Sequence, residues 1–229
     1  MMKKKKQTRL PAAKRRSQIL RSAVRAIARS NYRTTSIAEI AAEAGITEPA
    51  VYRYFPTKKA LFIAIIDDVG SRILILWETI IEQSPDLVAA MRNIAVNYYE
   101  RAMTRRGDLK VLFQALAEVD DEDIRAALRA QFSSYVQLLQ RLIEQCVEAR
   151  MVQADVDAEA VAWTWLSMGF TLNMVSLLGF DQEVDKMCML QILRLYPASF
   201  QTAGPFPPVN CPVGDPGRGL VDLLASPAR

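Results

Sequence analysis

Histidine is absent from this sequence of 229 residues. Its absence excludes serine–histidine triads, histidine general bases and histidine metal ligands. The three cysteines, Cys146, Cys188 and Cys211, stand far apart and include no Cys-x-x-Cys pair. An odd and scattered set is typical of free thiols in a reducing compartment. We therefore expect a cytoplasmic protein without a metal ion.

Motifs for catalysis are missing as well. The sequence contains no Gly-x-Ser-x-Gly, no P-loop and no Gly-x-Gly-x-x-Gly. Carboxylates gather at Asp67 and Asp68 and at residues 120–123. These groups are better explained as a helix face and a helix start than as acid–base pairs. The sequence predicts no enzyme, no catalytic residue and no cofactor.

Acidic residues are scarce in the first part of the chain. Residues 1–62 hold 15 Lys and Arg but only 3 Asp and Glu, and none of these acids precedes Glu39. The other residues hold 14 basic and 22 acidic side chains. A basic segment on an acidic remainder indicates a polyanionic partner for that segment.

Charge is also absent from residues 160–180, a run long enough to span a bilayer. Hydroxyl and amide side chains recur along this run, and acidic residues flank it on both sides, without a positive-inside pattern. A helix that is apolar all round is otherwise one buried on every side. We expect a buried helix at a subunit interface and no membrane; a membrane-anchored helical protein is the alternative.

Strand patterns are nearly absent, whereas helix periodicity and capping residues are frequent. The sequence therefore predicts an all-α protein. Helices are expected at residues 11–30, 36–44, 47–55, 58–82, 86–104, 108–119, 121–151, 157–178 and 183–199.

Capping residues set the expected ends of the second and third helices. Ser36 and Glu39 have the spacing of a capping box. Gly45 permits the positive φ that ends the second helix. Thr47 is expected to cap the third, with Pro49 in its first turn, where the missing N–H leaves no bond unmade.

Further caps are expected elsewhere. Asn31 is expected to end the first helix in a left-handed conformation. Pro56 should end the third helix, and Thr57 should cap the fourth. Ser84 followed by Pro85 should open the fifth.

The helix, glycine turn and helix of residues 37–54 form a helix-turn-helix pattern. Small Ala41 permits a close crossing and Gly45 makes the turn, while Val51 and Phe55 are expected in the core. In such a unit the second helix enters the major groove of double-stranded DNA.

This part of the sequence, "TTSIAEIAAEAGITEPAVYRYFPTKKALFIAII" at residues 34–66, resembles the tetracycline-repressor (TetR) family of transcriptional regulators. The matching positions are Gly45, Ile46, Thr47, Pro49, Val51, Tyr52, Tyr54, Phe55, Lys58 and Leu61. The resemblance implies an N-terminal three-helix helix-turn-helix DNA-binding domain, plus a larger helical domain for ligand binding and dimerisation. At Asn31 the family often has glycine.

The resemblance also implies roles for individual residues. Phosphate contacts are implied for Thr35, Ser36, Thr47, Tyr52 and Lys58. Groove contacts are implied for Glu48, Pro49, Ala50, Arg53 and Tyr54. The alternatives are capping for the hydroxyl residues, core packing for Tyr52, and phosphate rather than guanine as the partner of Arg53.

Lys58 carries a separate electrostatic argument. A cation at a helix N-terminus opposes the helix dipole, at a cost of roughly 0.3–1 kcal/mol. A structural role for Lys58 is therefore disfavoured. A nearby DNA phosphate would instead make the energy of a cation at this position favourable. We expect Lys58 to bind the DNA backbone.

The family further implies a homodimer formed through the last two helices, and a small-molecule effector bound among the middle helices. Candidate pocket residues are Trp77, Met103, Phe113, Phe132, Tyr135, Trp165, Met168 and Asn173. Each is also a typical core residue. Because the larger domain is apolar and lacks histidine, the expected effector is hydrophobic and carries little charge.

Taken together, the helix-turn-helix motif and the family resemblance imply a repressor that binds a palindromic operator as a homodimer and is released by a small hydrophobic effector. A DNA-binding regulator without an effector is the alternative. The expected organisation is a basic disordered arm at 1–10, the DNA-binding domain at 11–57, the effector-binding and dimerisation domain at 58–200, and a disordered Pro/Gly-rich tail at 201–229.

Overall fold

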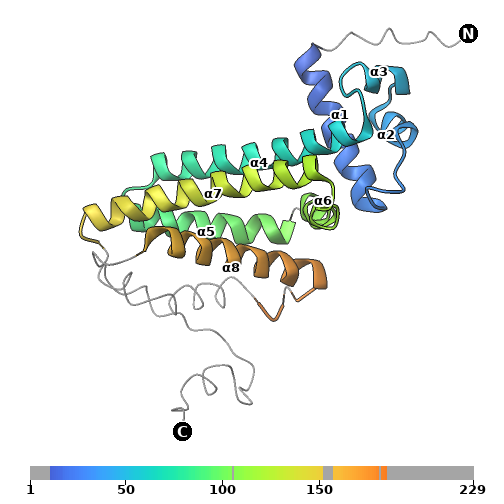
Figure 1. The fold of residues 1–229 in the computed structure, drawn as a ribbon. Coiled ribbons are helices and arrows are strands. Elements are labelled where there is room, and N and C mark those ends of the chain that lie inside the picture. Colours follow the sequence, from blue (N-terminus) through green and yellow to red (C-terminus); the bar gives the residue numbers. More distant parts are fainter. Residues whose placement is uncertain (1–10, 105, 152–156, 181, 185–229) are drawn as a thin grey trace, which may run out of the picture.

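The computed structural model describes residues 11–104, 106–151, 157–180 and 182–184, and the expected all-α fold is confirmed there (Figure 1). The helices are α1 (Ala12–Arg29), α2 (Ile37–Ala44), α3 (Glu48–Tyr52), α4 (Lys58–Gln83), α5 (Leu87–Thr104), α6 (Arg106–Leu116), α7 (Glu122–Glu148) and α8 (Ala158–Leu178). The predicted arm and tail lie outside the described residues, as does the predicted helix 183–199 apart from its first two residues.

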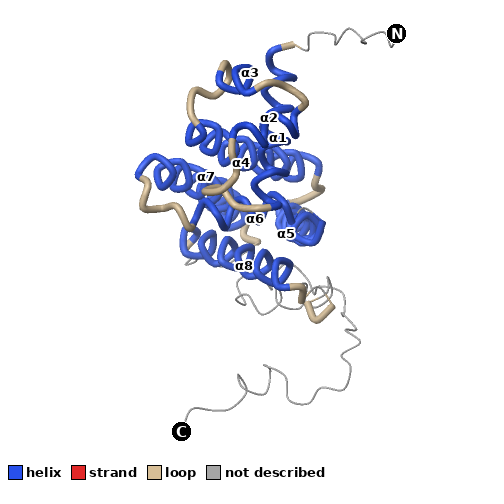
Figure 2. Tube along the Cα trace, turned by 90° about the vertical axis from the view of Figure 1, so that its right-hand side faces the viewer, coloured by secondary structure: helices blue, strands red, loops and turns tan. Residues whose placement is uncertain are grey.

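The helices form two parts, which we call the head (α1–α3) and the body (α4–α8). Figure 1 shows the head at one end of a long bundle of α4, α5, α7 and α8, with α6 where the bundle meets the head. The view turned by 90° in Figure 2 shows the head and α8 on opposite sides of the molecule. The bundle therefore separates the helix-turn-helix from α8.

The head is held together by the apolar stripe of α1. Ile19, Leu20, Ala23 and Ile27 recur at helical spacing and are almost completely buried. Ile40 of α2 lies in the same core cluster. This stripe is therefore the face of α1 that packs inside the head.

The core of the head continues into the body without a break. Its cluster includes Phe62 and Ile65 of α4, Val111 of α6 and Leu128 of α7. The ring of Phe62 stacks on that of Tyr32, with centroids 3.9 Å apart. The first turns of α4 thus belong to the hydrophobic core of the head as well as to the long helix of the body.

The predicted capping of α2 is confirmed. Ser36 Oγ accepts a hydrogen bond from the Glu39 N–H at 3.2 Å, and the Ser36 N–H donates to Glu39 Oε2 at 2.6 Å. Gly45 follows the helix with φ of 65°. Thr57 caps α4, because its hydroxyl accepts from the Ala60 N–H at 2.9 Å.

Other predicted helix ends are wrong in detail. Asn31 is not left-handed; its side chain accepts a hydrogen bond from the Thr34 N–H at 2.8 Å and stabilises the turn after α1. The Thr47 side chain makes no capping bond. Asp86, rather than Ser84, caps α5 by accepting from the Ala89 N–H. Ser84 instead donates to the carbonyl of Ile80 at the end of α4.

The body has its own apolar core, in which aromatic side chains are prominent. Trp77 of α4, Ile94 of α5, Tyr135 of α7 and Leu166 of α8 belong to one cluster. The rings of Trp77 and Tyr135 are tilted, with centroids 5.3 Å apart. These contacts bring the four long helices together around an interior that the next subsection describes.

Helix α8 buries one face within this chain and exposes the other, so its expected burial at a subunit interface stays a prediction. Leu172 and Ser176 are buried, whereas Trp163, Met174 and Leu178 are exposed. Ser176 donates a hydrogen bond to the carbonyl of Ala102 at 2.7 Å. By length and composition alone α8 could cross a membrane, and it is the one helix in the described part of the chain that could.

We predict that Phe62→Ala lowers the free energy of unfolding by about 3–5 kcal/mol, because it opens a cavity in the core shared by head and body. Ile75→Ala on the same helix removes a side chain that is 61% exposed. We expect this control to change stability by no more than about 0.5 kcal/mol. Urea unfolding monitored by circular dichroism measures both, and equal effects of the two substitutions would contradict the shared core.

Candidate DNA interface and interior cavity

The helix-turn-helix is formed by α2, the turn at Gly45 and α3. The turn closes with hydrogen bonds from the Gly45 N–H to the Ala42 carbonyl and from the Ile46 N–H to the Ala41 carbonyl. Val51 and Phe55 are 0% and 3% exposed, as expected of core residues. The third helix ends at Tyr52 rather than near Pro56, and residues 53–54 continue as a turn. The two core side chains therefore orient a very short helix.

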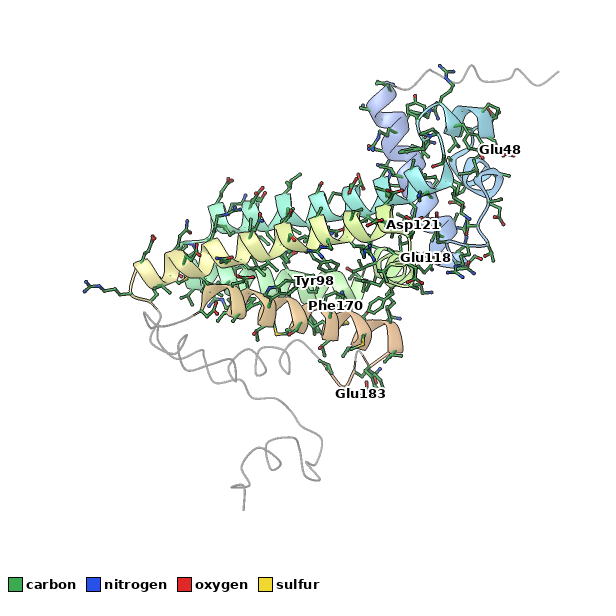
Figure 3. The ribbon with its side chains drawn as sticks, viewed as in Figure 1. Glu48, Tyr98, Glu118, Asp121, Phe170 and Glu183 are labelled. Atoms are coloured by element: carbon green, nitrogen blue, oxygen red, sulfur yellow. The ribbon has the colours of Figure 1, made fainter. Side chains whose placement is uncertain are left out.

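The other side of this segment faces solvent. Thr47, Glu48, Pro49 and Arg53 are exposed, and Tyr52 is 46% exposed although it is aromatic. Ala50 and Tyr54 are half-buried. Figure 3 shows Glu48 on the head, away from the bundle. The structure thus brings the residues predicted from this segment together beside one short helix.

At the N-terminus of α2 the structure distinguishes two adjacent threonines. Thr35 is 2% exposed, and its hydroxyl donates to the carbonyl of Asn31 at 2.7 Å. The predicted phosphate contact of Thr35 is therefore wrong for this conformation, because the hydroxyl is buried and already bonded. Thr34, which the sequence analysis missed, is exposed beside Ser36. No periodicity distinguishes two neighbouring threonines in a turn, so the sequence carried no signal for this choice.

Lys58 has a structural role that the sequence argument disfavoured. Its ammonium donates to the carbonyl of Arg33 at 2.9 Å and lies 4.9 Å from the centre of the Tyr32 ring. Burial lowers the pKa of Lys58 from its usual value. A carbonyl and an aromatic face offset the unfavourable helix dipole. Lys58 therefore connects α4 to the turn after α1 in the chain without DNA.

The arginines of the basic segment differ in their partners. Arg25 and Arg29 both donate to the carboxylate of Glu43, and these hydrogen bonds lower the pKa of Glu43. Arg33 pairs with Glu118 at 2.7 Å. Arg53 is exposed and has no hydrogen-bond or ion-pair partner within the described residues. Arg21 on α1 is likewise exposed and has no such partner among the described residues, so Arg53 is distinguished by its place beside α3, where an external anion can reach it.

A cavity lies inside the body, with a volume of about 60 Å³. Its walls come from α4, α5, α6, α7 and α8. Tyr98 and Phe170, two of the lining residues, are labelled in the interior of the bundle in Figure 3. A second cavity of about 30 Å³ adjoins it and shares Trp77, Tyr98 and Leu166 as walls. Two small cavities thus lie on either side of three shared side chains.

Two polar pairs line the first cavity. Tyr98 and Asn173 are hydrogen-bonded to each other, with O–O and N–O distances of 3.1 and 2.9 Å. Gln131 Nε2 donates to the Tyr135 hydroxyl at 2.6 Å. Burial raises the pKa of Tyr98 to about 12 and also raises that of Tyr135. Both phenols therefore stay neutral at neutral pH, in an interior that disfavours charge.

The predicted pocket residues divide into three groups. Trp77, Phe132, Tyr135 and Asn173 line the first cavity. Trp165 and Met168 line the second. Met103 and Phe113 line neither, because both are half-buried at other faces of their helices.

The sequence analysis missed Tyr98, Gln131 and Phe170 as lining residues. A signal existed for Gln131, because it follows Leu128 by three residues and precedes Tyr135 by four, in phase with the apolar stripe of α7. Tyr98 stands in the same way four residues after Ile94. No cluster of three or more Cys, Asp or Glu suited to a metal ion occurs in the part of the chain that the structure describes.

Comparison with known proteins identifies the head. Residues 19–65 match the family described as bacterial regulatory proteins, tetR family. The chain belongs to the TetR family of transcriptional regulators. The TetR family comprises DNA-binding regulators and not enzymes, which confirms that the chain is not an enzyme and supports a soluble protein rather than a membrane-anchored one.

Individual relatives of this TetR-family protein agree with that assignment. The HTH-type transcriptional regulator AcrR of Shigella flexneri is 29% identical over 157 residues, which cover 66% of this chain and 73% of AcrR. The nucleoid occlusion factor SlmA of Pasteurella multocida is 28% identical over 101 residues, 44% of this chain and half of SlmA.

Solved structures show the same fold at low sequence identity. A TetR transcription regulator from Haloarcula marismortui has a TM-score of 0.70 at 18% identity and covers 80% of this chain and 96% of its own. GusR of Salmonella enterica has a TM-score of 0.67 at 18% identity, and the match covers 81% of this chain and 95% of GusR. The body therefore has the TetR-family fold, although its sequence is not diagnostic.

We predict that Arg53→Ala weakens operator binding by about 1–3 kcal/mol. If Arg53 contacts a phosphate, the slope of log affinity against log salt falls by about one; if it reads a base, one operator position loses its preference instead. Arg141→Ala, an exposed arginine far along α7, is the control and should change neither property. Fluorescence anisotropy at several salt concentrations measures both. Unchanged affinity for Arg53→Ala would exclude Arg53 from the interface.

Proposed function

We propose that this TetR-family DNA-binding regulator is a cytoplasmic homodimeric repressor, which binds a palindromic operator and releases it when a small hydrophobic effector enters the interior cavity. The observation that carries the proposal is the position of α4. Its first turns lie in the core of the head, and Trp77 near its other end lines the cavity. A ligand that displaces α4 therefore changes the position of the reading helix.

The DNA-contacting surface in this proposal combines two helix N-termini. Free N–H groups and the helix dipole favour phosphate at the start of α2, next to Thr34 and Ser36. The exposed residues around α3 then face the groove, since the first residues of a recognition helix meet base edges. The proposed contacts are Thr34, Ser36, Thr47, Glu48, Pro49, Ala50, Tyr52, Arg53, Tyr54 and Lys58.

Helix α6 offers a second connection between cavity and head. Leu109 and Leu112 line the cavity. Gln114 Oε1 accepts a hydrogen bond from the Tyr32 N–H at 2.7 Å, and its Nε2 donates to the carbonyl of Ile27 at 3.3 Å. One short helix therefore contacts both the effector site and the end of α1. This arrangement supports an effector response over the alternative of a regulator without an effector.

The exposed face of α8 supports the proposed homodimer. Trp163, Met174, Leu178 and Phe180 are large apolar side chains left in solvent in the single chain. A row of this kind on one helix is typical of a protein interface. Two heads held in a fixed relation can read two half-sites, which gives a single short recognition helix the specificity that it lacks alone.

Selection of bound fragments from a random DNA pool tests the operator. We expect enrichment of an inverted repeat whose half-sites are separated by about one helical turn of DNA or a multiple of it. The full chain serves as bait, and Arg53→Ala serves as the matched comparison. Enrichment of single, unrepeated sites would contradict binding as a symmetric dimer, and the absence of any enriched sequence would contradict a specific operator.

Light scattering tests the dimer. We predict a mass of twice the 25.7 kDa chain at micromolar concentration. The double substitution Trp163→Arg and Met174→Arg should give single chains, because two cations on each copy would oppose one another in the interface. Ile75→Arg places a cation on an exposed apolar position of α4 and should leave the mass of the dimer unchanged. A dimeric mass for the double variant would place the interface elsewhere.

A further inference from the structure

Two buried polar atoms beside the first cavity have no hydrogen-bond partner among the residues that the structure describes. They are Nε1 of Trp77 and Oε1 of Gln131. Trp77 is 5% exposed and Gln131 is 9% exposed, and both line the cavity. Buried polar groups nearly always have a partner, and leaving one without costs free energy. This pair therefore indicates a site where a further polar group binds.

The remaining polar groups of the cavity already satisfy one another. Tyr98 is bonded to Asn173, and the other end of the Gln131 amide is bonded to Tyr135. The charged lining residues, Arg101 and Asp108, have opposite signs, and Asp108 also pairs with Arg72 at 3.7 Å. The raised pKa values of the two tyrosines agree with an interior that disfavours charge. The polar groups left to bind a ligand in this cavity are therefore the indole N–H of Trp77 and the amide oxygen of Gln131, both of which are neutral.

The position of the Gln131 amide is set by a glycine on the neighbouring helix. A Cβ added to Gly70 of α4 would lie 2.7 Å from both Cγ and Cδ of Gln131. Such a distance is too short for carbon atoms, so the absent side chain is what admits the amide. The amide therefore packs directly on the backbone of α4, the helix that also carries Trp77.

The two atoms differ in chemistry, and one ligand group suits both. An indole N–H only donates, and a carboxamide oxygen only accepts. A hydroxyl group accepts from the first and donates to the second. If the Gln131 amide is turned over, its NH₂ group takes the place of the oxygen. The hydroxyl oxygen of the ligand then accepts a hydrogen bond from that NH₂ group as well as from the indole N–H. In the amide orientation that the structure gives, a carboxylate cannot pair with the amide oxygen and an ammonium cannot pair with the indole N–H. In either orientation of the amide, both would bring a charge into the apolar interior.

We propose that the cavity binds a small uncharged ring compound carrying a hydroxyl group, which accepts a hydrogen bond from Trp77 Nε1 and donates one to Gln131 Oε1. This inference rests on the proposed effector function and names the chemical class of the effector. The ring lies against aromatic walls, where Phe132 and Phe170 are stacked with centroids 5.2 Å apart. A water molecule is the usual partner of such atoms in a free cavity. A ligand hydroxyl replaces its hydrogen bonds and adds apolar contact.

The size of the cavities limits the ligand to about one ring. The volumes of about 60 and 30 Å³ are small beside a pocket for a drug-sized molecule. Rotation of Trp77, Tyr98 or Leu166, the three shared walls, would join the two spaces. Phenol is therefore the probe of choice, with toluene as its counterpart without a hydroxyl and benzoate as its charged counterpart.

Calorimetric titration of the full chain at neutral pH tests the assignment. We expect phenol to bind with a dissociation constant of roughly 1 mM or below, the range of a small fragment. Toluene and benzoate should bind at least about fivefold more weakly, the loss expected when one or two hydrogen bonds are missing. Equal affinity for phenol and toluene would overturn the proposal, as would the absence of phenol binding at about 10 mM.

Substitution of the donor shows where phenol binds. Trp77→Phe keeps a ring but removes the N–H, and we expect it to weaken phenol binding about three- to tenfold while leaving toluene binding unchanged. Ile75→Ala changes an exposed side chain on the same helix and should alter neither affinity. Retained toluene binding shows that the Trp77 variant is folded. Phenol binding that does not respond to Trp77→Phe would place the ligand outside this cavity.

The operator complex separates this inference from the function on which it rests. Phenol that binds in a Trp77-dependent way and also dissociates the DNA complex supports both. Phenol that binds in this way but leaves the complex intact confirms the ligand class and contradicts the effector response. Dissociation by toluene or benzoate but not by phenol supports an effector response and overturns the hydroxyl assignment.

Discussion

The position of helix α4 in two hydrophobic cores is the constraint on which the rest of the structure depends. Its first turns bury Phe62 and Ile65 among the helices of the head, and Trp77 lies in the core of the body. Because buried side chains are close-packed, neither end of a continuous helix can shift without displacing its neighbours. The head therefore shares its hydrophobic core with the body, and the boundary expected at residues 57–58 crosses that core.

Polar contacts add directional links around this apolar connection. Lys59 pairs with Asp121 and Asp123 at the start of α7, and these hydrogen bonds raise the pKa of Lys59. Glu118 and Asp121 lie together near the start of α4 (Figure 3). Exposed ion pairs contribute little free energy each and are screened by salt. Their value here is geometric. The Lys59 pairs hold the start of α4 against the start of α7, and the pair of Arg33 with Glu118 links the head to the body.

The parts predicted well from the sequence share one property, namely that their determinants are local. The capping box of Ser36 and Glu39, the turn at Gly45 and the stripe of α1 are set by residues a few positions apart. The wrong predictions chose the wrong one of two polar residues that lie close together in the sequence. Thr35 points inward and Thr34 outward, and Asp86 rather than Ser84 caps α5. Such choices depend on the path of the chain on either side, which no local pattern contains.

The sequence alone determined an all-α TetR-family protein with a helix-turn-helix within residues 37–54, since helix periodicity, caps and a closely spaced motif are encoded within short segments. Only the tertiary structure decided which aromatic residues surround a cavity, and that Gln131 packs on Gly70 rather than in solvent. It also gave Lys58 a carbonyl and a ring as partners. These features arise between helices far apart in the chain, where the packing of side chains, rather than their spacing, determines the contacts.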